Sequence, residues 1–370
     1  MSADLRAIQA CLDNELDPKQ IGDRLITGII GDRPSQYAKS PSIWNPTFQA
    51  LGMHAVFLAF DVSADRLKDL LQALRASERC LGGSVTVPYK IAVMEHLDEV
   101  DDKARRIGAV NMFVRTPDGR LIGYNTDGKG GIDCLTRPQP GSAGPFIADL
   151  AGTDVLMIGA GGAARALAFY LAEAIRGGRL ILTNRTLDHA RRLADGLNRA
   201  YGNAEVIEEA ELERVAPRVG LIVNCTVKGQ GGLRKLTDGR ATVMEPYSGL
   251  APARPAALPP DEYRSEAEFY RRWFAASLAD IEANNAASAR LALAVPPEVR
   301  FFDIVYAPLE TVMLRHARLT GHRTLNGKGM NIGQAADGFF DKVCRGYLEA
   351  RGMHTPQTYE RILQVMYQVW

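Results

Sequence analysis

The stretch that decides the fold of this chain runs Val155-Leu-Met-Ile-Gly-Ala-Gly-Gly-Ala-Ala164. Its four apolar residues predict a buried strand, and the small residues after them predict a tight turn into a helix. Gly159 permits the turn, Gly161 lets the backbone approach a pyrophosphate, and a small residue at Ala163 or Ala164 allows close helix–strand packing. Because a helix start supplies N–H donors, the turn predicts a dinucleotide site. Its expected binding residues are Gly159, Ala160, Gly161, Gly162 and Ala163.

The residues that follow the next predicted strand indicate which dinucleotide binds. This strand, at 179–183, leads into Asn184-Arg185-Thr186. A site for NAD usually has an acidic residue there, about 20 residues beyond the glycine turn. Arg185 instead offers a guanidinium to a ribose 2′-phosphate, and Thr186 offers a hydroxyl donor. The sequence therefore predicts NADP(H) held by Asn184, Arg185 and Thr186. NAD stays open as an alternative, and so does a plain surface role for Arg185.

Composition excludes several other classes of function. The formal net charge is +1, so no overall field favours nucleic acid or an anionic membrane. No window approaches ~18 uninterrupted apolar residues, and the N-terminus lacks the apolar segment of a signal peptide. The five cysteines are scattered, which favours the cytoplasm over a disulfide framework. The six histidines show no metal-ligand spacing, so we expect no metal site.

Strands and helices alternate along the whole chain. This alternation predicts an α/β fold with parallel strands joined by right-handed crossovers. At 370 residues, two domains are expected, and the Pro- and Gly-rich segment 137–144 suits a loop near their boundary. The apolar runs that predict strands lie at 25–30, 55–60, 83–87, 153–158, 179–183, 219–224 and 299–306.

Two further clusters contain side chains suited to proton transfer. One is Ser84-Val-Thr-Val-Pro-Tyr-Lys90, a strand whose proline turn presents the lysine, and the other is Gly123-Tyr-Asn-Thr-Asp127. Transfer of a hydride from an alcohol requires a group that takes the hydroxyl proton. A lysine beside an aspartate suits that task. Taken alone, however, a lysine that follows a turn usually points to solvent.

These motifs together resemble the shikimate/quinate dehydrogenase family over nearly the full length of the chain. The resemblance implies that Lys90 and Asp127 are the catalytic pair at the reacting hydroxyl. It also implies that Tyr306 lies near the substrate carboxylate and the nicotinamide, and that Thr226 and Gly329 contact the cofactor. Ser40, Ser84, Thr86, Asn111 and Gln334 would hold the substrate. The matching motifs, in the order of the family, are SVTVPYK, IGAVN, GYNTDG, IGAGGAARA, TNRT, NCTVKG, DIVYAPLET and NGKGMNIGQ.

By this resemblance we expect two α/β domains with a cleft between them. The substrate-binding domain would comprise 1–128 plus 325–370, and a Rossmann-type NADP-binding domain would comprise 129–324. The second domain would contain a helical insertion at about 229–298, where the family has a short connection. There Tyr270, Phe274, Leu278 and Ile281 recur at helical spacing beside Phe269 and Trp273, a pattern typical of core or subunit contact. We therefore expect this arm to cover the nucleotide domain or to build a homodimer.

Two positions depart from the pattern of the family. The segment Tyr37-Ala-Lys-Ser-Pro41 keeps Ser40 but has Ala38 where the family has a second serine for the substrate carboxylate. Ser84 stands where an asparagine usually holds a ring hydroxyl. Losing a hydrogen bond to a buried carboxylate costs about 1–3 kcal/mol, a loss that Lys39 could offset. These changes suggest a substrate that differs from plain shikimate.

The resemblance implies reversible hydride transfer between NADP(H) and a ring hydroxyl or ketone. The partner would be a small cyclic hydroxy acid: shikimate, quinate or a related cyclic polyol carboxylate. A ligand-sensing protein that uses the same fold without turnover is the alternative. Retention of both Lys90 and Asp127 speaks against it.

Overall fold

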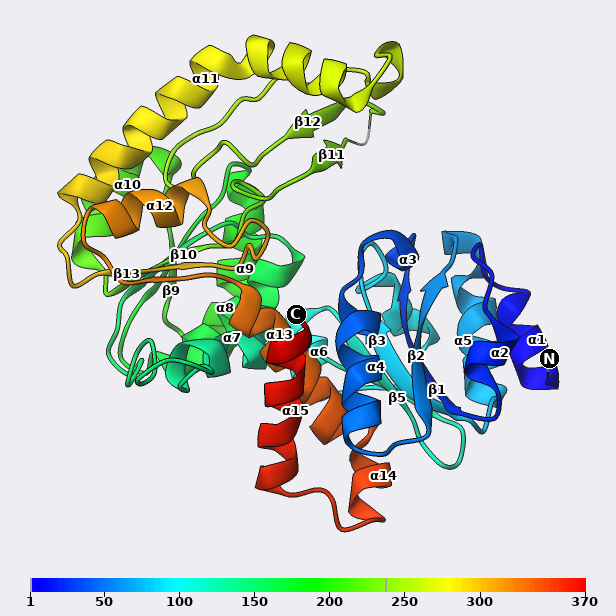
Figure 1. Cartoon of the computed structure of the whole chain (residues 1–370). Coiled ribbons are helices and arrows are strands. Elements are labelled where there is room, and N and C mark those ends of the chain that lie inside the picture. The colour runs from blue at the N-terminus through cyan, green and yellow to red at the C-terminus, as the bar shows by residue number, and fades with distance from the viewer. Residues whose placement is uncertain (1, 237) are drawn as a thin grey trace. The chain divides into compact units, whose positions relative to one another are not determined.

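The computed structural model of the chain describes residues 2–236 and 238–370. It divides into two compact units, and each has its own β-sheet with helices packed on it (Figure 1). The predicted α/β class is therefore confirmed. Unit 1 comprises Met1–Asp133, Gln139–Ala143 and Ile332–Trp370, and unit 2 comprises Cys134–Pro138 and Gly144–Asn331.

The sheet of unit 1 is built from β1 (Leu25–Gly31), β2 (Ala55–Asp61), β3 (Cys80–Val85), β4 (Glu99–Val100), β5 (Met112–Arg115) and β6 (Leu121–Tyr124), in the order β2-β1-β3-β5-β6-β4. Strand β1 pairs with β2 and β3 in parallel, as predicted. Strands β5 and β6 were not predicted from the sequence, and β5 is antiparallel to both β3 and β6, so this sheet is not wholly parallel. The connection Thr116–Arg120 makes β5 and β6 antiparallel, because it is too short for a crossover and turns through Gly119 at φ +86°.

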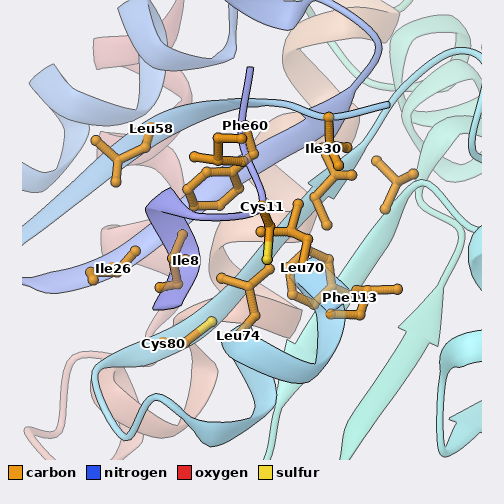
Figure 2. Close-up of a cluster of buried hydrophobic side chains, with 14 of the residues drawn as sticks. Ile8, Cys11, Ile26, Ile30, Leu58, Phe60, Leu70, Leu74, Cys80 and Phe113 are labelled. Carbon is orange, nitrogen blue, oxygen red and sulfur yellow. The ribbon is translucent and has the colours of Figure 1, made fainter. Parts of the chain in front are cut away.

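The helices of unit 1 are α1 (Ala3–Gln9), α2 (Pro18–Ile21), α3 (Pro34–Tyr37), α4 (Ser40–Ala50), α5 (Leu67–Ala76), α6 (Asp102–Ile107), α14 (Arg345–Glu349) and α15 (Pro356–Val369), with the turns η1 (Ala64–Arg66), η2 (Ala92–His96) and η6 (Gly338–Val343). On one face of the sheet, α1 and α5 pack against alternate strand residues such as Ile26 and Ile30 (Figure 2). On the other face, the Trp44 ring of α4 lies 4.7 Å from that of Phe57 and 5.0 Å from that of Phe339, centroid to centroid. Because successive strand side chains point to opposite faces, the same strands supply both clusters.

The sheet of unit 2 is built from β7 (Val155–Ile158), β8 (Leu180–Thr183), β9 (Ala204–Val206), β10 (Leu221–Asn224), β13 (Arg300–Asp303) and β14 (Thr324–Leu325), in the order β14-β13-β10-β7-β8-β9. Every neighbouring pair in this order is parallel, which confirms the predicted Rossmann-type sheet. The central strands β7, β8 and β10 are fully buried because helices pack on both faces of such a sheet. The other elements of the unit are α8 (Gly162–Ala174), α9 (Leu187–Ala200), α10 (Leu212–Val215), α12 (Val312–Leu319), η3 (Glu209–Glu211) and η4 (Ala216–Arg218).

The predicted insertion forms a helical arm of unit 2 (Figure 1). Its long helix α11 (Glu266–Ala294) agrees with the predicted helix, and the stretch before it contains an antiparallel hairpin of β11 (Leu233–Lys235) and β12 (Ala241–Val243), followed by the turn η5 (Pro260–Glu262). The predicted apolar stripe of α11 is only partly buried. Trp273 and Ile281 are buried, but Phe274 is 48% exposed and Leu278 is 41% exposed.

The buried face of α11 is instead partly polar. Ser277, Asn284 and Ser288 are buried on it. The Asn284 Nδ2 atom lies 3.0 Å from the carbonyl oxygen of Ala251 and 2.9 Å from that of Pro252. An irregular segment buries carbonyl groups that need donors, so polar side chains occupy helix positions that apolar periodicity would reserve for leucine. This is why the spacing of apolar residues alone did not predict which face of α11 is buried.

A buried carboxyl group lies where β13 ends. Asp303 accepts hydrogen bonds from Thr311 Oγ1 at 2.7 Å, Asn224 Nδ2 at 3.0 Å and the backbone N–H of Val305 at 3.0 Å. The side chain is fully buried. Burial raises the pKa of Asp303 to about 7, although the three donors lower it.

This pKa predicts a specific pH dependence of stability. Between about pH 4 and about pH 7 the folded chain keeps a proton on Asp303 that the unfolded chain, with a carboxyl pKa of about 3.9, has released. The free energy of unfolding should therefore fall by about 2 kcal/mol between about pH 5 and about pH 7, and Asp303→Asn should lack this contribution. Urea denaturation of both proteins measures it. If the free energies of unfolding of the wild type and of Asp303→Asn differed by the same amount at every pH, the prediction would be contradicted.

Candidate active site

A polar cluster in unit 1 gathers residues from four separate segments. Lys90 lies in the turn that follows β3, and Asn111 directly precedes β5. Asp127 is the first residue of α7 (Asp127–Thr136), and Gln334 lies on α13 (Lys328–Asp337). The backbone N–H of Val110 donates to the carbonyl oxygen of Lys90 at 2.7 Å, which fixes the turn beside β5.

The Asp127 carboxylate lies at the centre of this cluster. Its Oδ2 atom accepts from Lys90 Nζ at 2.6 Å, and its Oδ1 atom accepts from Asn111 Nδ2 at 2.7 Å. The side chains of Lys90 and Asp127 keep 25% and 12% of their surface exposed, so the pair is shielded but accessible. Asn111 Nδ2 also lies 3.1 Å from Gln334 Oε1. The structure thus brings four predicted site residues into direct contact.

Thr126 belongs to the same cluster, although we did not predict it as a site residue. Its backbone N–H donates to Asn111 Oδ1 at 2.8 Å, and its hydroxyl donates to the carbonyl oxygen of Gln334 at 3.0 Å. Asn125 Oδ1 accepts from the backbone N–H of Asp127 at 3.1 Å. Their place inside the GYNTDG motif was the available signal. Both residues orient the neighbours that present the carboxylate.

The other predicted substrate residues lie near the ends of neighbouring elements. Ser84 is on β3, and its buried Oγ atom has no hydrogen-bond partner among the described residues. Thr86 follows that strand, and its methyl group lies against Gly31 at the end of β1. Ser40 is half-buried at the start of α4, and none of the hydrogen bonds of the described residues joins it to Asp127. Ala38 packs on the apolar cluster beside Trp44.

A buried ion pair joins the two helices that hold Asp127 and Gln334. Lys129 Nζ on α7 lies 2.8 Å from Asp133 Oδ2 and 2.7 Å from Asp337 Oδ1 on α13. Burial raises the pKa of Asp337, and Lys129 opposes that rise. Burial lowers the pKa of Lys129, but the two carboxylates outweigh it and hold the pKa above its ordinary value.

Removing the lysine should therefore destabilise the folded chain. Lys129→Met leaves the Asp337 carboxylate buried without its cation, and we expect a loss of about 2 kcal/mol in the free energy of unfolding. A fully enclosed pair would cost more, but 34% of the Lys129 side chain is exposed. The double variant Lys129→Met/Asp337→Asn should recover part of the loss, because the more deeply buried carboxylate is removed while Asp133 keeps its charge. Urea denaturation tests this, and additive losses in the double variant would argue against the pair.

The glycine turn of unit 2 has the geometry that a dinucleotide requires. Gly159 has φ +111°, and a Cβ atom there would lie 2.8 Å from the carbonyl group of Cys225. At Gly161 and Gly162 an added Cβ would meet nothing within 4 Å, so the space before α8 is open. Ala163 is exposed in the first turn of that helix. The turn therefore fits a pyrophosphate against the helix start.

The residues after β8 complete this surface. Asn184 Oδ1 accepts from the backbone N–H of Ala160 at 3.2 Å, and its Nδ2 atom donates to the carbonyl oxygen of Thr186 at 2.8 Å. Asn184 thus holds the glycine turn and the next loop together. Arg185 and Thr186 are exposed, and the Arg185 guanidinium has no hydrogen bond or ion pair to residues 2–236 and 238–370. Such a guanidinium is available to a phosphate.

Three further predicted residues occupy different parts of unit 2. Thr226 lies beside the turn, since a Cβ on Gly159 would meet its backbone nitrogen at 3.0 Å. Tyr306 is half-buried in the loop after β13, and burial raises the pKa of its hydroxyl. Gly329 is buried in the first turn of α13, and none of the described hydrogen bonds links it to the glycine turn that precedes α8.

The described residues also bear on membrane spans and metal sites. In the described part of the chain, no helix combines the length and the apolar character needed to span a membrane. The same residues contain no group of three or more His, Cys, Asp or Glu side chains placed to hold a metal ion.

A Rossmann-type unit with this glycine turn, and an α/β unit with a shielded Lys–Asp pair, define a nucleotide-dependent oxidoreductase of two units. The model of the shikimate dehydrogenase substrate binding domain matches residues 29–113, and that of shikimate / quinate 5-dehydrogenase matches residues 143–235. The shikimate dehydrogenase (NADP(+)) of Symbiobacterium thermophilum is 35% identical over 319 residues, covering 85% of this chain and 87% of the relative. The enzyme of the same name from Methanocaldococcus jannaschii is 31% identical over 318 residues, covering 85% and 89%. The chain belongs to the shikimate dehydrogenase family.

Solved structures agree with this assignment. Shikimate 5-dehydrogenase from Listeria monocytogenes, in complex with shikimate and NAD, has a TM-score of 0.65 at 26% identity, covering 89% of this chain and 96% of that chain. The enzyme from Thermus thermophilus, in complex with NADP(H) and shikimate, has a TM-score of 0.62 at 26% identity, covering 94% and 100%. Membership in this family of catalytic proteins favours the oxidoreductase over the ligand-sensing alternative.

Proposed function

We propose that this chain catalyses reversible hydride transfer between NADP(H) and a ring hydroxyl or ketone of shikimate, quinate or a related cyclic polyol carboxylate. The contact between Lys90 Nζ and Asp127 Oδ2, at 2.6 Å, is the observation that carries the proposal. It places a proton donor and its partner in a shielded cluster whose other members are amide and hydroxyl groups. Such groups suit a polyol, because they donate and accept hydrogen bonds without adding charge.

In this proposal the Lys–Asp pair handles the proton and the cofactor handles the hydride. The nicotinamide, when bound, supplies or accepts the hydride at the carbinol carbon. In ketone reduction, the Lys90 ammonium donates a proton to the oxygen that becomes the hydroxyl group. Asp127 accepts a hydrogen bond from that ammonium and keeps it in position. In alcohol oxidation the same proton returns from the substrate hydroxyl to Lys90.

The remaining predicted residues would bind and orient the two ligands. Thr86, Asn111 and Gln334 would hold ring hydroxyls, Ser40 would hold the carboxylate, and Tyr306 would lie near the carboxylate and the nicotinamide. NADP(H) would be held by the glycine turn together with Asn184, Arg185, Thr186, Thr226 and Gly329. NAD would bind at the same place with lower affinity.

The residues Ser84 and Ala38 do not determine which substituents the ring of the substrate carries. Ser84 Oγ is buried without a partner among the described residues, so a substrate group can satisfy it. At Ala38, the packed methyl group supplies no hydrogen bond to a carboxylate. Both features support a substrate related to shikimate or quinate but with altered substituents.

The direct test is turnover. Purified protein is incubated with NADP+ and a panel of cyclic hydroxy acids that includes shikimate and quinate, and NADPH is followed by its absorbance. We expect turnover with at least one member, and faster turnover with NADP+ than with NAD+. Tight binding of a ring acid without turnover of any member would favour the ligand-sensing alternative.

The cellular setting and the assembly are part of the same proposal. All five cysteines are free and buried, which supports a reducing compartment, the cytoplasm. Leu278 and Leu293 of α11 are 41% and 73% exposed, which supports a homodimer built through the arm. Analytical ultracentrifugation of the wild type and of Leu293→Lys distinguishes a dimer from a monomer.

A further inference from the structure

The insertion of unit 2 and the segment after β13 line an open cavity that the proposed reaction does not use. Its volume is about 670 Å³, within the range of sites that bind small organic molecules. Helix α11 forms one wall with Tyr270 and Trp273, and the segment after β12 contributes Glu245. The loop after β13 and the start of α12 form the other wall with Pro308 and Arg315. None of these residues belongs to either site described above.

The charged side chains that line this cavity differ in whether they form an ion pair. Arg271 and Arg315 both line it, and neither guanidinium has a hydrogen bond or ion pair to the described residues. Glu310 also lines it, but Arg318 donates to its two oxygens at 2.6 and 3.3 Å. Arg318 therefore offsets most of the charge of Glu310, Arg315 contributes a smaller electrostatic effect, and Glu245 is the remaining acid. Two unpaired guanidinium groups against one carboxylate favour an anionic occupant.

The apolar part of the lining is aromatic. Tyr270, Trp273 and Phe274 contribute to it from consecutive turns of α11. Trp273 Nε1 lies 3.1 Å from Thr242 Oγ1 and 3.0 Å from the carbonyl oxygen of Ala256, so its ring is held in one orientation. Phe274 is 48% exposed and lines the cavity. A flat ring would cover these faces and remove that surface from water.

We propose that this cavity is a binding site for a small aromatic carboxylate. The ring packs on Tyr270 and Phe274, and the carboxylate accepts hydrogen bonds from Arg271 and Arg315. Arginine is suited to this role because its planar guanidinium pairs with a carboxylate through two parallel hydrogen bonds. The occupant also contacts Pro308 and Glu310, which belong to the loop that holds Tyr306.

The test uses an isosteric pair of probes on the full chain. Phenylacetate and its neutral analogue phenylacetamide are titrated by isothermal calorimetry, in the presence of saturating NADPH and shikimate. These two ligands fill the proposed catalytic site but cannot react with each other, since both are reduced. We expect phenylacetate to bind and phenylacetamide to bind at least about tenfold more weakly, because the hydrogen bonds to a charged acceptor are lost.

Variants locate the binding. Arg271→Ala and Arg315→Ala should each weaken phenylacetate binding about tenfold or more. Arg272→Ala is the matched control, because Arg272 is exposed on the same helix and does not line the cavity. Thermal melting of each variant checks that it is folded. Hydrogen exchange with phenylacetate present should slow at 268–276 and 305–311.

Several results would overturn the proposal. They are equal affinity for the acid and the amide, unchanged affinity in both arginine variants, slowed exchange only in other segments, and no binding at millimolar phenylacetate. Each of these is independent of turnover. Failure of this proposal is therefore distinguishable from failure of the proposed dehydrogenase activity.

Discussion

Replacing Lys90 by alanine is expected to lower kcat by about 10²–10⁴-fold, the usual contribution of a positioned acid or base. The reason is geometric, since Lys90 Nζ is the group that contacts Asp127 Oδ2 at 2.6 Å. The affinity for NADP+ should change little, because the glycine turn belongs to unit 2. Steady-state kinetics with the best ring acid, together with fluorescence titration of NADPH, measure both quantities.

Two further variants sharpen this result. Lys90→Arg keeps a cation beside Asp127, but a guanidinium does not release its proton near neutral pH. We therefore expect its kcat to stay low while its KM remains near that of the wild type. Lys68→Ala removes an exposed lysine of α5 from the same unit and should leave kcat unchanged. A Lys90→Ala protein with a near-wild-type rate would remove Lys90 from the mechanism.

Replacing Arg185 by alanine is expected to weaken NADP+ binding by about 10–100-fold and NAD+ binding by much less. Loss of a hydrogen bond to a charged group costs about 1.5–3 kcal/mol, and only NADP+ has the 2′-phosphate. The Arg185 guanidinium is exposed and makes no ion pair within the described chain, so no internal contact is lost.

The matched control for this substitution lies on α9. Arg191 is also exposed, but its Nη1 atom already lies 3.0 Å from Asp188 Oδ1. Arg191→Ala should therefore leave the preference between the two cofactors unchanged. Dissociation constants for NADP+ and NAD+ are measured on each variant. Equal losses for both cofactors in Arg185→Ala would contradict a contact with the 2′-phosphate.

Periodicity and turn residues predicted most of the fold, because they report local burial and local geometry. The parallel sheet of unit 2 follows from apolar runs that are buried on both faces, and the turn at Gly159 from a backbone with positive φ. The antiparallel pairing of β5 was not predicted, since it depends on the partners of a short strand with little pattern of its own. The buried face of α11 was misjudged because Asn284 pairs there with distant carbonyl groups.

The candidate site was predicted in part because its motifs resemble those of the shikimate/quinate dehydrogenase family. Lys90, Asn111, Asp127 and Gln334 occur in recognisable motifs, and the structure brings them into contact. The ion pair of Lys129 with Asp337 spans 208 positions of the sequence, and no local pattern relates the two residues. Partners of this kind become visible only when the helices that hold them are packed together.

The polar face of α11 has a consequence for how this protein could have been assembled. Asn284 donates hydrogen bonds to carbonyl groups of the segment before α11. Lys228, in the loop that follows β10, donates to the carbonyl oxygen of Ala251 at 2.6 Å. Deleting residues 229–298 would therefore remove an acceptor of Lys228, a residue of the nucleotide unit outside the arm. The arm is therefore part of the hydrogen-bonded structure of unit 2. We expect the sequence of the arm and that of the sheet of unit 2 to have changed together.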